Sequence, residues 1–209
     1  MVLVSHNHYD HLDTRTLARL HATHDPRIVT PLGNDTIIRT ATPAAKISIH
    51  DWGDRLDFEN GVTVHVEPAH HWSARGTRDR SKALWSGFVI DTPAGKIYFA
   101  GDTGFQGGHI YRALAEKHGT FRLAILPIGA YEPRWFMEAQ HQNPEEAVEG
   151  MQLCNAAHAA GCHWGTFPLT DEPIDEPRNR LHSALDAQGI GRERFRAMVP
   201  GEVWDVPAE

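Results

Sequence analysis

Residues 5–13 read SHNHYDHLD and place three histidines and two aspartates within nine positions. The apolar run MVLV precedes them, so we expect a short buried strand to feed this loop. In an extended backbone, His6 and His8 point the same way because side chains alternate with period two. Asp10 and His11 follow after a bend and address a second point in space. Imidazole and carboxylate groups suit zinc, or less selectively iron or manganese, so the loop is predicted to supply half the ligands of two metal ions.

Further ligands are expected where other apolar runs end in polar residues. EPAHHWS contributes His70 and His71, YFAGDTGF contributes Asp102 between glycines, and CHWGTF contributes His163. Taken singly, each of these groups has the alternative of being a satisfied core residue or a helix cap. Strand ends that meet at one edge of a layered sheet bring such side chains together, so we interpret them jointly as one metal site. The remaining alternative for residues 5–13 is a polar surface loop, which the dense spacing after an apolar run disfavours.

Length and composition indicate one α/β domain over residues 1–209. The chain has 209 residues, of which 41% are hydrophobic and 22% are charged, as in soluble globular proteins. A formal net charge of −7 argues against a nucleic-acid partner, which would require a basic face. The sequence shows neither the pattern of a signal peptide nor an apolar run of about 18 residues, so a cytoplasmic protein is expected.

Strand and helix patterns alternate along the chain, as is typical of an α/β fold. We expect short strands at residues 1–6, 27–31, 46–52, 62–68 and 122–130, and a hairpin over 84–105. Helices are expected after Asp13, over 33–41, 109–119 and 179–188, and over 143–161, where Asn143 is the cap and Pro144 the first helical residue. The last two strands are expected at 162–167 and 197–206.

The first motif has the His-x-His-x-Asp-His signature of the metallo-β-lactamase superfamily. Together with PAHHWSARG, LWSGFVI, GDTGF, GAYEPRWFMEAQHQNPEEAV and HWGTF, it resembles one branch, the N-acylphosphatidylethanolamine phospholipase D-like hydrolases. The resemblance extends to about Phe167 and implies a four-layer αββα sandwich. Met1 lies only five residues ahead of His6, so the N-terminal strands of the first sheet are expected to be lacking. An exposed sheet edge of that kind favours a homodimer or aggregation.

The resemblance implies two Zn²⁺ per chain, with iron or manganese as alternatives. The implied ligands of the first zinc are His6, His8 and His71. The implied ligands of the second zinc are Asp10, His11 and His163, and Asp102 resembles the carboxylate that bridges both ions. His71 is preferred to His70 because the family's ligand directly precedes the tryptophan.

A metal pair of this kind lowers the pKa of a shared water, and the resulting bridging hydroxide attacks phosphorus or a carbonyl carbon. Asp102 would set the spacing of the metals. His141, beside Gln140, matches a histidine of the family's active site that is not a ligand. It would donate a hydrogen bond to the oxyanion or protonate the leaving group, unless it merely caps the helix at Asn143.

The implied substrate is a phosphodiester of the N-acyl phosphatidylethanolamine type. Arg75 lies in a basic loop that could meet an anionic head group, and Trp135 in RWFM could touch an acyl chain with peripheral membrane contact. The structural alternatives are that Arg75 lies in a solvated surface loop and that Trp135 belongs to the hydrophobic core. The alternative functions are a di-metal lactonase or ester hydrolase acting on a small molecule, and a truncated metal-binding remnant without turnover.

Overall fold

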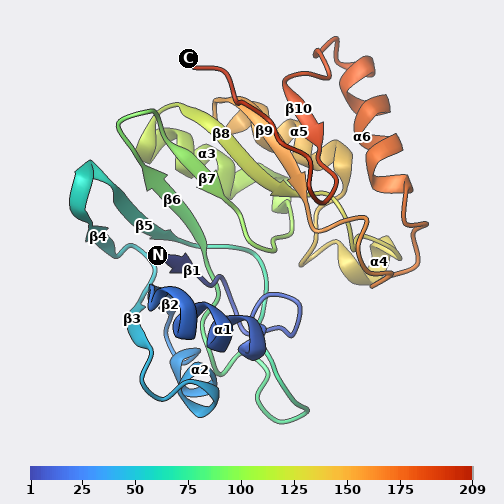
Figure 1. Cartoon of the computed structure of the whole chain (residues 1–209). Helices are drawn as coiled ribbons and strands as arrows, with labels where there is room; N and C mark the ends of the chain where they lie inside the picture. The colour runs from blue at the N-terminus through green and yellow to red at the C-terminus, as the bar shows by residue number, and fades with distance from the viewer. Residues whose placement is uncertain (209) are drawn as a thin grey trace.

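A computed structural model describes residues 1–208 and contains two facing sheets with helices on both outer sides (Figure 1). The first sheet has the order β1-β2-β3 and is parallel throughout, because helices form the connections between its strands. Its elements are β1 (Val2–Leu3), α1 (Thr14–His24), β2 (Arg27–Pro31), α2 (Asp35–Ala41) and β3 (Lys46–His50).

The second sheet is larger and mixed, with the order β10-β9-β8-β7-β6-β5-β4. Strands β4 to β7 are antiparallel to their neighbours, whereas β7 to β10 are parallel. Its strands are β4 (Arg55–Asp57), β5 (Thr63–Glu67), β6 (Gly87–Asp91), β7 (Ile97–Phe99), β8 (Phe121–Pro127), β9 (Ala156–Cys162) and β10 (Phe195–Ala197). The helices of this half are α3 (His109–His118), α4 (Arg134–Met137), α5 (Pro144–Leu153) and α6 (Glu176–Ala187), with short 3₁₀ turns at Glu59–Gly61 and Gln106–Gly108.

The outer face of the second sheet is covered by α3, α5 and α6, which enclose the largest apolar cluster. Its bulkiest fully buried members are Tyr98, Tyr111, Phe121, Phe195, Leu126, Ile128 and Met151. Burial of each large apolar side chain contributes about 1.5–3 kcal/mol, so this layer carries much of the folding free energy. A second cluster, which includes Leu17 and Ile38, fills the space between the first sheet and helices α1 and α2.

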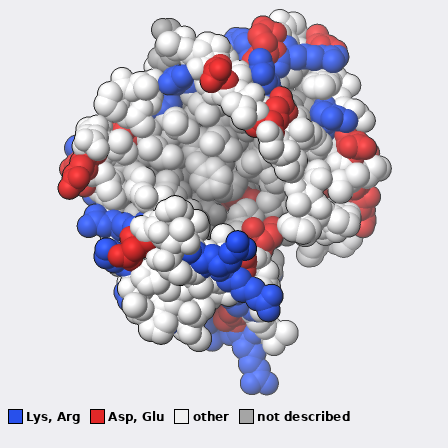
Figure 2. All heavy atoms as spheres, viewed as in Figure 1, with Lys and Arg blue, Asp and Glu red and all other residues white. Residues whose placement is uncertain are grey.

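The two sheets face one another across a smaller core. Val64 and Val66 of β5 point into this core and pack with Phe88 of β6. Three strands cannot cover seven, so Leu123 and Ile125 of β8 remain half-buried on the inner face. Figure 2 shows this face of the molecule hollowed at its centre. The prediction of a four-layer αββα sandwich is therefore confirmed.

The predicted boundaries around α5 are right at its start and wrong at its end. Asn143 caps the helix by accepting from the Glu146 amide, and Pro144 follows, as predicted. The helix expected over residues 143–161 ends at Leu153, because Asn155 takes a left-handed conformation with φ of 57°. The alanine-rich stretch that follows is strand β9, where pairing with both β8 and β10 overrides helical propensity.

Three other expectations differ from the structure. Of the strand expected over residues 162–167, only Cys162 is in a strand, as the last residue of β9; residues 163–167 form a loop, because His163 and Gly165 adopt φ of 59° and 74°. The last strand, β10, ends at Ala197 and does not extend over 197–206. Strand β4 was not expected, because only Arg55–Asp57 form it and so short a segment carries no alternation signal.

Gly129, just after β8, gives a test of the packing beneath the strand ends. A Cβ atom at this position would collide with the carbonyl oxygen of His163, which is backbone and cannot swing away. We expect Gly129→Ala to lower the free energy of unfolding by about 1–3 kcal/mol, measured by urea unfolding of the metal-free chain. Gly76→Ala is the control, because its Cβ would meet only Asp79, at 3.8 Å, so a change within about 0.5 kcal/mol is expected. Equal stability of the two variants would contradict this packing.

Candidate metal centre

The loop between β1 and α1, here called the ligand loop (residues 5–12), is fixed at both ends. Val4 precedes it and Leu12 ends it, and both side chains are buried in the apolar cluster of the first sheet. Within the loop, the backbone N–H groups of His11 and Leu12 donate to the carbonyl of His8. Beyond it, the Asp13 carboxylate accepts from the first amides of α1, so Asp13 is a helix cap. The polar side chains of the loop are therefore held on a rigid frame.

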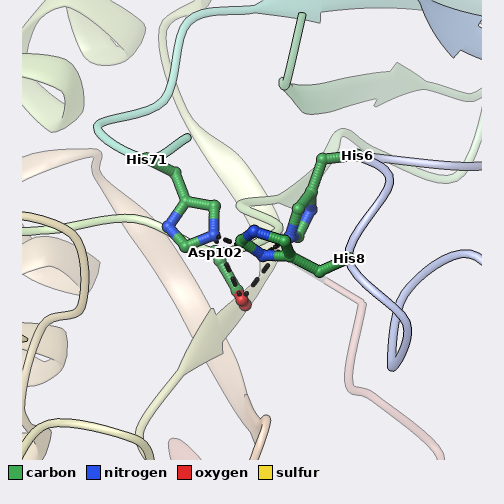
Figure 3. A group of neighbouring side chains, drawn as sticks. All are labelled: His6, His8, His71 and Asp102. Atoms are coloured by element: carbon green, nitrogen blue, oxygen red, sulfur yellow. Dashed lines mark hydrogen bonds and ion pairs between the residues drawn. The ribbon is translucent and has the colours of Figure 1, made fainter. Parts of the chain in front are cut away.

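Three imidazole nitrogens converge at the strand ends (Figure 3). The Nε2 atom of His6 lies 2.9 Å from Nδ1 of His8, and Nε2 of His71 lies 3.1 Å from the same atom. His71 comes from the loop after β5, so the group joins the first sheet to the second. The Asp102 carboxylate lies beneath the three rings.

The hydrogen bonds around this group fix the form of its rings. Nδ1 of His71 lies 3.1 Å from the carbonyl oxygen of Gln140, which can only accept, so Nδ1 carries the proton and Nε2 keeps its lone pair. Burial lowers the pKa of His71 to about 3, although Asp102 opposes this shift, and burial likewise lowers the pKa of His6. Both rings are therefore neutral at neutral pH, which is the form that binds a metal.

The other predicted ligands form a second group beside the first. Oδ2 of Asp10 lies 3.3 Å from Nε2 of His11 and 3.1 Å from Nε2 of His163. Asp102 Oδ2 lies 3.0 Å from Nε2 of His11 and 3.4 Å from that of His163. The same oxygen is 3.8 Å from Nε2 of His6 on the first side, so Asp102 lies between the two groups. The structure thus brings together the seven residues that the sequence singled out.

The charges of the cluster balance one another without a cation. The Asp102 side chain is only 3% exposed, and burial opposes its charge, but the surrounding imidazoles hold its pKa well below the usual range. Burial also opposes a proton on His11, yet Asp102 and Asp10 outweigh it and raise the pKa of His11 to about 10. The pKa of His163 is raised for the same reason. A divalent cation would replace these protons.

The donor set fits such a cation. The ligand atoms of each group lie within 4.8 Å of one another. Imidazole nitrogens and carboxylate oxygens are typical ligands of zinc, and they also bind iron or manganese. Oδ1 of Asp102 is buried and has no hydrogen-bond partner among residues 1–208. An unpaired carboxylate oxygen at the centre of the cluster is costly unless a ligand satisfies it.

His141 lies at the edge of this cluster. Its Nε2 atom is 4.0 Å from Oδ2 of Asp102, and its ring centroid is 5.0 Å from that of His71. Burial lowers its pKa to about 4 against the opposing effect of Asp102, so the ring is neutral. Asn143 itself caps α5, so the structure places His141 at the cluster and not at the helix cap.

The remaining predicted residues lie in different places. Gln140 lines the cavity above the cluster, whereas Trp135 on α4 is 84% exposed and packs against Phe136. The Arg75 guanidinium donates to backbone carbonyls of the ligand loop. Substrate contacts by these three residues stay predictions. His70 turns away from the cluster and lines a separate cavity beside α3.

The supports of the ligand rings were not predicted. Ser5 Oγ lies 3.0 Å from Nδ1 of His6, and the backbone of Gln140 holds His71. Asp13 caps α1 and Asp91 lies at the far end of β6, so neither carboxylate supports a ligand ring. The sequence could have indicated the support from Ser5, because its hydroxyl is next to His6. It could not have indicated the support from Gln140, because every residue has a backbone carbonyl.

Two cavities meet at the cluster. The larger, of about 550 Å³, reaches His8 and His141 and has Trp72, Phe136 and Met137 in its walls. The smaller, of about 270 Å³, is lined on its apolar side by Phe99, Trp164 and Phe167. Residues that border both are Asp10, Asp102, His163 and Leu169. A substrate at the cluster can therefore extend in two directions.

A further group of potential ligands lies elsewhere, on the outer side of β5. His65, Glu67 and His118 approach one another there. The Lys117 ammonium donates to Oε1 of Glu67 at 2.8 Å, and Nε2 of His118 lies 2.9 Å from the same oxygen. Lys117 already balances the charge of Glu67, so this group is a set of side-chain ion pairs and not a second metal centre of the proposal.

The αββα sandwich and the histidine and aspartate cluster at its strand ends together define the metallo-β-lactamase fold class. The chain belongs to the beta-lactamase superfamily, whose domain profile matches residues 1–164. It is 39% identical over 214 residues to N-acyl-phosphatidylethanolamine-hydrolyzing phospholipase D 1 of Caenorhabditis elegans, covering 97% of this chain and 60% of that protein.

A second sequence relative and a solved structure are also similar to this chain. The mitochondrial N-acyl-phosphatidylethanolamine-hydrolyzing phospholipase D of Saccharomyces cerevisiae is 35% identical, over 91% of this chain and 41% of that protein. The chain thus spans less than two thirds of the length of either phospholipase relative. The crystal structure of isothiocyanate hydrolase from Delia radicum gut bacteria matches with a TM-score of 0.72 at 19% identity, over 96% of this chain and 74% of that one. This last match shows a shared fold.

Protons and cations should compete for the second group. Asp102 and Asp10 keep a proton on His11 up to a pKa of about 10, so a cation that binds there below that pH must displace it. We expect the affinity for Zn²⁺ to rise by up to about tenfold per pH unit between about pH 6.5 and about pH 8.5, measured by competition with a chelator. His11→Ala should flatten this slope, whereas His70→Ala should keep it. An affinity independent of pH in the unmodified chain would contradict the protonated form of His11.

Proposed function

We propose that this chain is a metal-dependent hydrolase that cleaves phosphodiesters of the N-acyl phosphatidylethanolamine type, in the manner of a phospholipase D. The observation that carries the proposal is the position of Asp102, whose buried carboxylate is shared by two groups of ligands at the meeting point of two cavities. Similarity to two relatives named as phospholipase D supports the substrate class. The proposed cofactor is a pair of divalent cations, Zn²⁺ before iron or manganese.

The cations, when bound, supply Lewis acidity and make water nucleophilic at neutral pH. The protein fixes the geometry around them: Asp102 holds both groups of ligands, and the Gln140 carbonyl keeps the proton of His71 on Nδ1. His141 is neutral at pH 7 because its pKa is about 4. It therefore acts as a hydrogen-bond donor to the oxygen that gains negative charge, and not as the acid that protonates the leaving group.

The shape of the site favours a diester over a lactone. A phosphodiester carries two substituents on one phosphorus, and the two cavities leave the cluster on either side of Leu169. Phe136 and Met137 in the larger cavity suit an apolar substituent such as an acyl chain. An unsubstituted lactone has a single ring and would leave one cavity without a role, whereas a di-metal lactonase or ester hydrolase acting on substituted substrates is the alternative.

A comparison of substrates tests this function. The zinc-loaded chain should hydrolyse two diesters, bis-p-nitrophenyl phosphate and N-acyl phosphatidylethanolamine in mixed micelles. It should hydrolyse them faster than the monoester p-nitrophenyl phosphate or a panel of lactones. His141→Ala should lose about 100- to 1000-fold in kcat and keep its metal content. His70→Ala, one residue from a ligand but facing another cavity, should keep both.

Each of the other outcomes rejects part of the proposal. Faster hydrolysis of lactones would favour the lactonase. Metal uptake without turnover of any substrate would identify a metal-binding remnant. Loss of metal from the His141 variant would make His141 a ligand.

The rim of the cavities suits contact with a lipid surface. Five large apolar side chains around the mouth are more than half exposed: Tyr9, Trp135, Phe136, Phe167 and Leu169. Aromatic side chains of this kind favour the boundary between water and lipid. Among residues 1–208, no helix has the length and apolar composition needed to cross a bilayer. We therefore propose peripheral contact through this rim, which would let a lipid enter the larger cavity directly.

Trp135 allows this contact to be tested. Trp135→Ala should weaken binding to phosphatidylethanolamine–phosphatidylglycerol vesicles by about tenfold or more, because burial of a large apolar side chain contributes about 1.5–3 kcal/mol. Hydrolysis of the soluble diester should stay unchanged. Val203→Ala is the control, since Val203 is also 84% exposed but lies in the C-terminal tail. Vesicle binding that is equal in both variants would contradict a contact through the rim.

A further inference from the structure

We propose that Arg75 is a positioning residue of the metal centre, whose guanidinium locks the ligand loop in the shape that gathers its four ligands. The inference rests on the proposed metal centre and concerns how the protein prepares it. Arg75 lies in the segment after β5, here called the bracing loop (residues 72–82), and not in the ligand loop itself. Among the described residues, those that line the two cavities at the cluster do not include Arg75.

The guanidinium joins two carbonyls of the ligand loop. Nη1 of Arg75 donates to the carbonyl oxygen of Asn7 at 3.2 Å and to that of Leu12 at 2.7 Å. These two residues enclose the turn that carries His8, and both are almost completely buried. A buried carbonyl without a donor is costly, and a donor with a permanent charge binds it more strongly than a neutral one. Arg75 thus holds the turn at both ends with one group.

Tyr9 returns the contact. Its ring lies 3.9 Å from Cζ of Arg75, and its hydroxyl donates to the Arg75 carbonyl oxygen at 3.1 Å. The side chain of each residue therefore contacts the other's loop or backbone. Tyr9 lies between the ligands His8 and Asp10 in the sequence, so movement of this tyrosine would carry both ligands with it.

The bracing loop is itself held in place. The Asp79 carboxylate accepts from the backbone N–H groups of Arg75 and Gly76, at 2.9 and 2.8 Å. The loop starts directly after His71, so Arg75 also connects the ligand loop to the histidine of the first group that comes from the second sheet. Arg78 in the same loop is exposed and offers a matched control.

Arg75→Met tests this role through metal affinity. The purified chain is stripped of metal, and its affinity for Zn²⁺ is measured by competition with a chromophoric chelator. We expect Arg75→Met to weaken binding by about 10- to 100-fold, as is typical when a group that orients metal ligands is removed. Arg75→Lys keeps the charge but loses the planar fork, so we expect a smaller loss. Arg78→Met should bind as the unmodified chain does.

A spectroscopic measurement separates positioning from general stability. The visible spectrum of the Co²⁺-loaded protein should change in Arg75→Met, because the ligand geometry is altered, and stay the same in Arg78→Met. Should Arg75→Met fail to fold, Arg75→Lys and Tyr9→Phe are measured in its place, and both should weaken Zn²⁺ binding.

The outcomes are distinct. Unchanged affinity and an unchanged Co²⁺ spectrum in the Arg75 variants would overturn the role of Arg75 alone. An equal loss in Arg78→Met would assign the effect to the charge of the loop and also overturn it. Absence of metal uptake by the unmodified chain would overturn the proposed metal centre itself.

Discussion

A buried negative charge governs this structure. The carboxylate of Asp102 lies at the end of β7, 3% exposed, where an ionised group costs several kcal/mol unless positive charge surrounds it. Imidazoles from three other segments of the chain supply that charge as protons or leave room for cations. The glycine before it, Gly101, has φ of 63° and lies in contact with Ser5, so the strand end approaches the ligand loop closely. The strand ends of both sheets therefore lie close together at this edge because their histidines surround the charge of Asp102.

Elements whose signals are local could be predicted from the sequence. The start of α5 is an example, because Asn143 and Pro144 determine it whatever the rest of the fold does. Its end is the opposite case. Residues 156–160 are small and prefer a helix when isolated, and they form a strand because β8 and β10 flank them on both sides. Pairing with β10, more than thirty residues later in the chain, has no signal within the segment itself.

The site divides in the same way. Its ligands stand out because histidines and aspartates are concentrated directly after apolar runs, and the resemblance to a family selects His71 over His70. Apart from the Ser5 hydroxyl beside His6, the groups that orient them were not predictable, because their contacts involve backbone carbonyls. Any residue at position 140 could offer the carbonyl that fixes the tautomer of His71. Arg75 was interpreted as a contact for an anionic head group, and its structural role left no local signal, since the two carbonyls that it contacts lie 68 and 63 positions away.

The origin of the ligands has a consequence for how the molecule comes apart. The ligand loop belongs to the small first sheet, whereas His71, Asp102 and His163 belong to the second, and the core between the sheets is modest. A cation bound at the cluster is thus a cross-link between two bodies of unequal size. Without it, we expect the segment up to β3 to open before the larger body, which keeps its own core around Tyr98 and Phe121. Metal content would then decide whether the chain exchanges its amide hydrogens as one cooperative unit or as two.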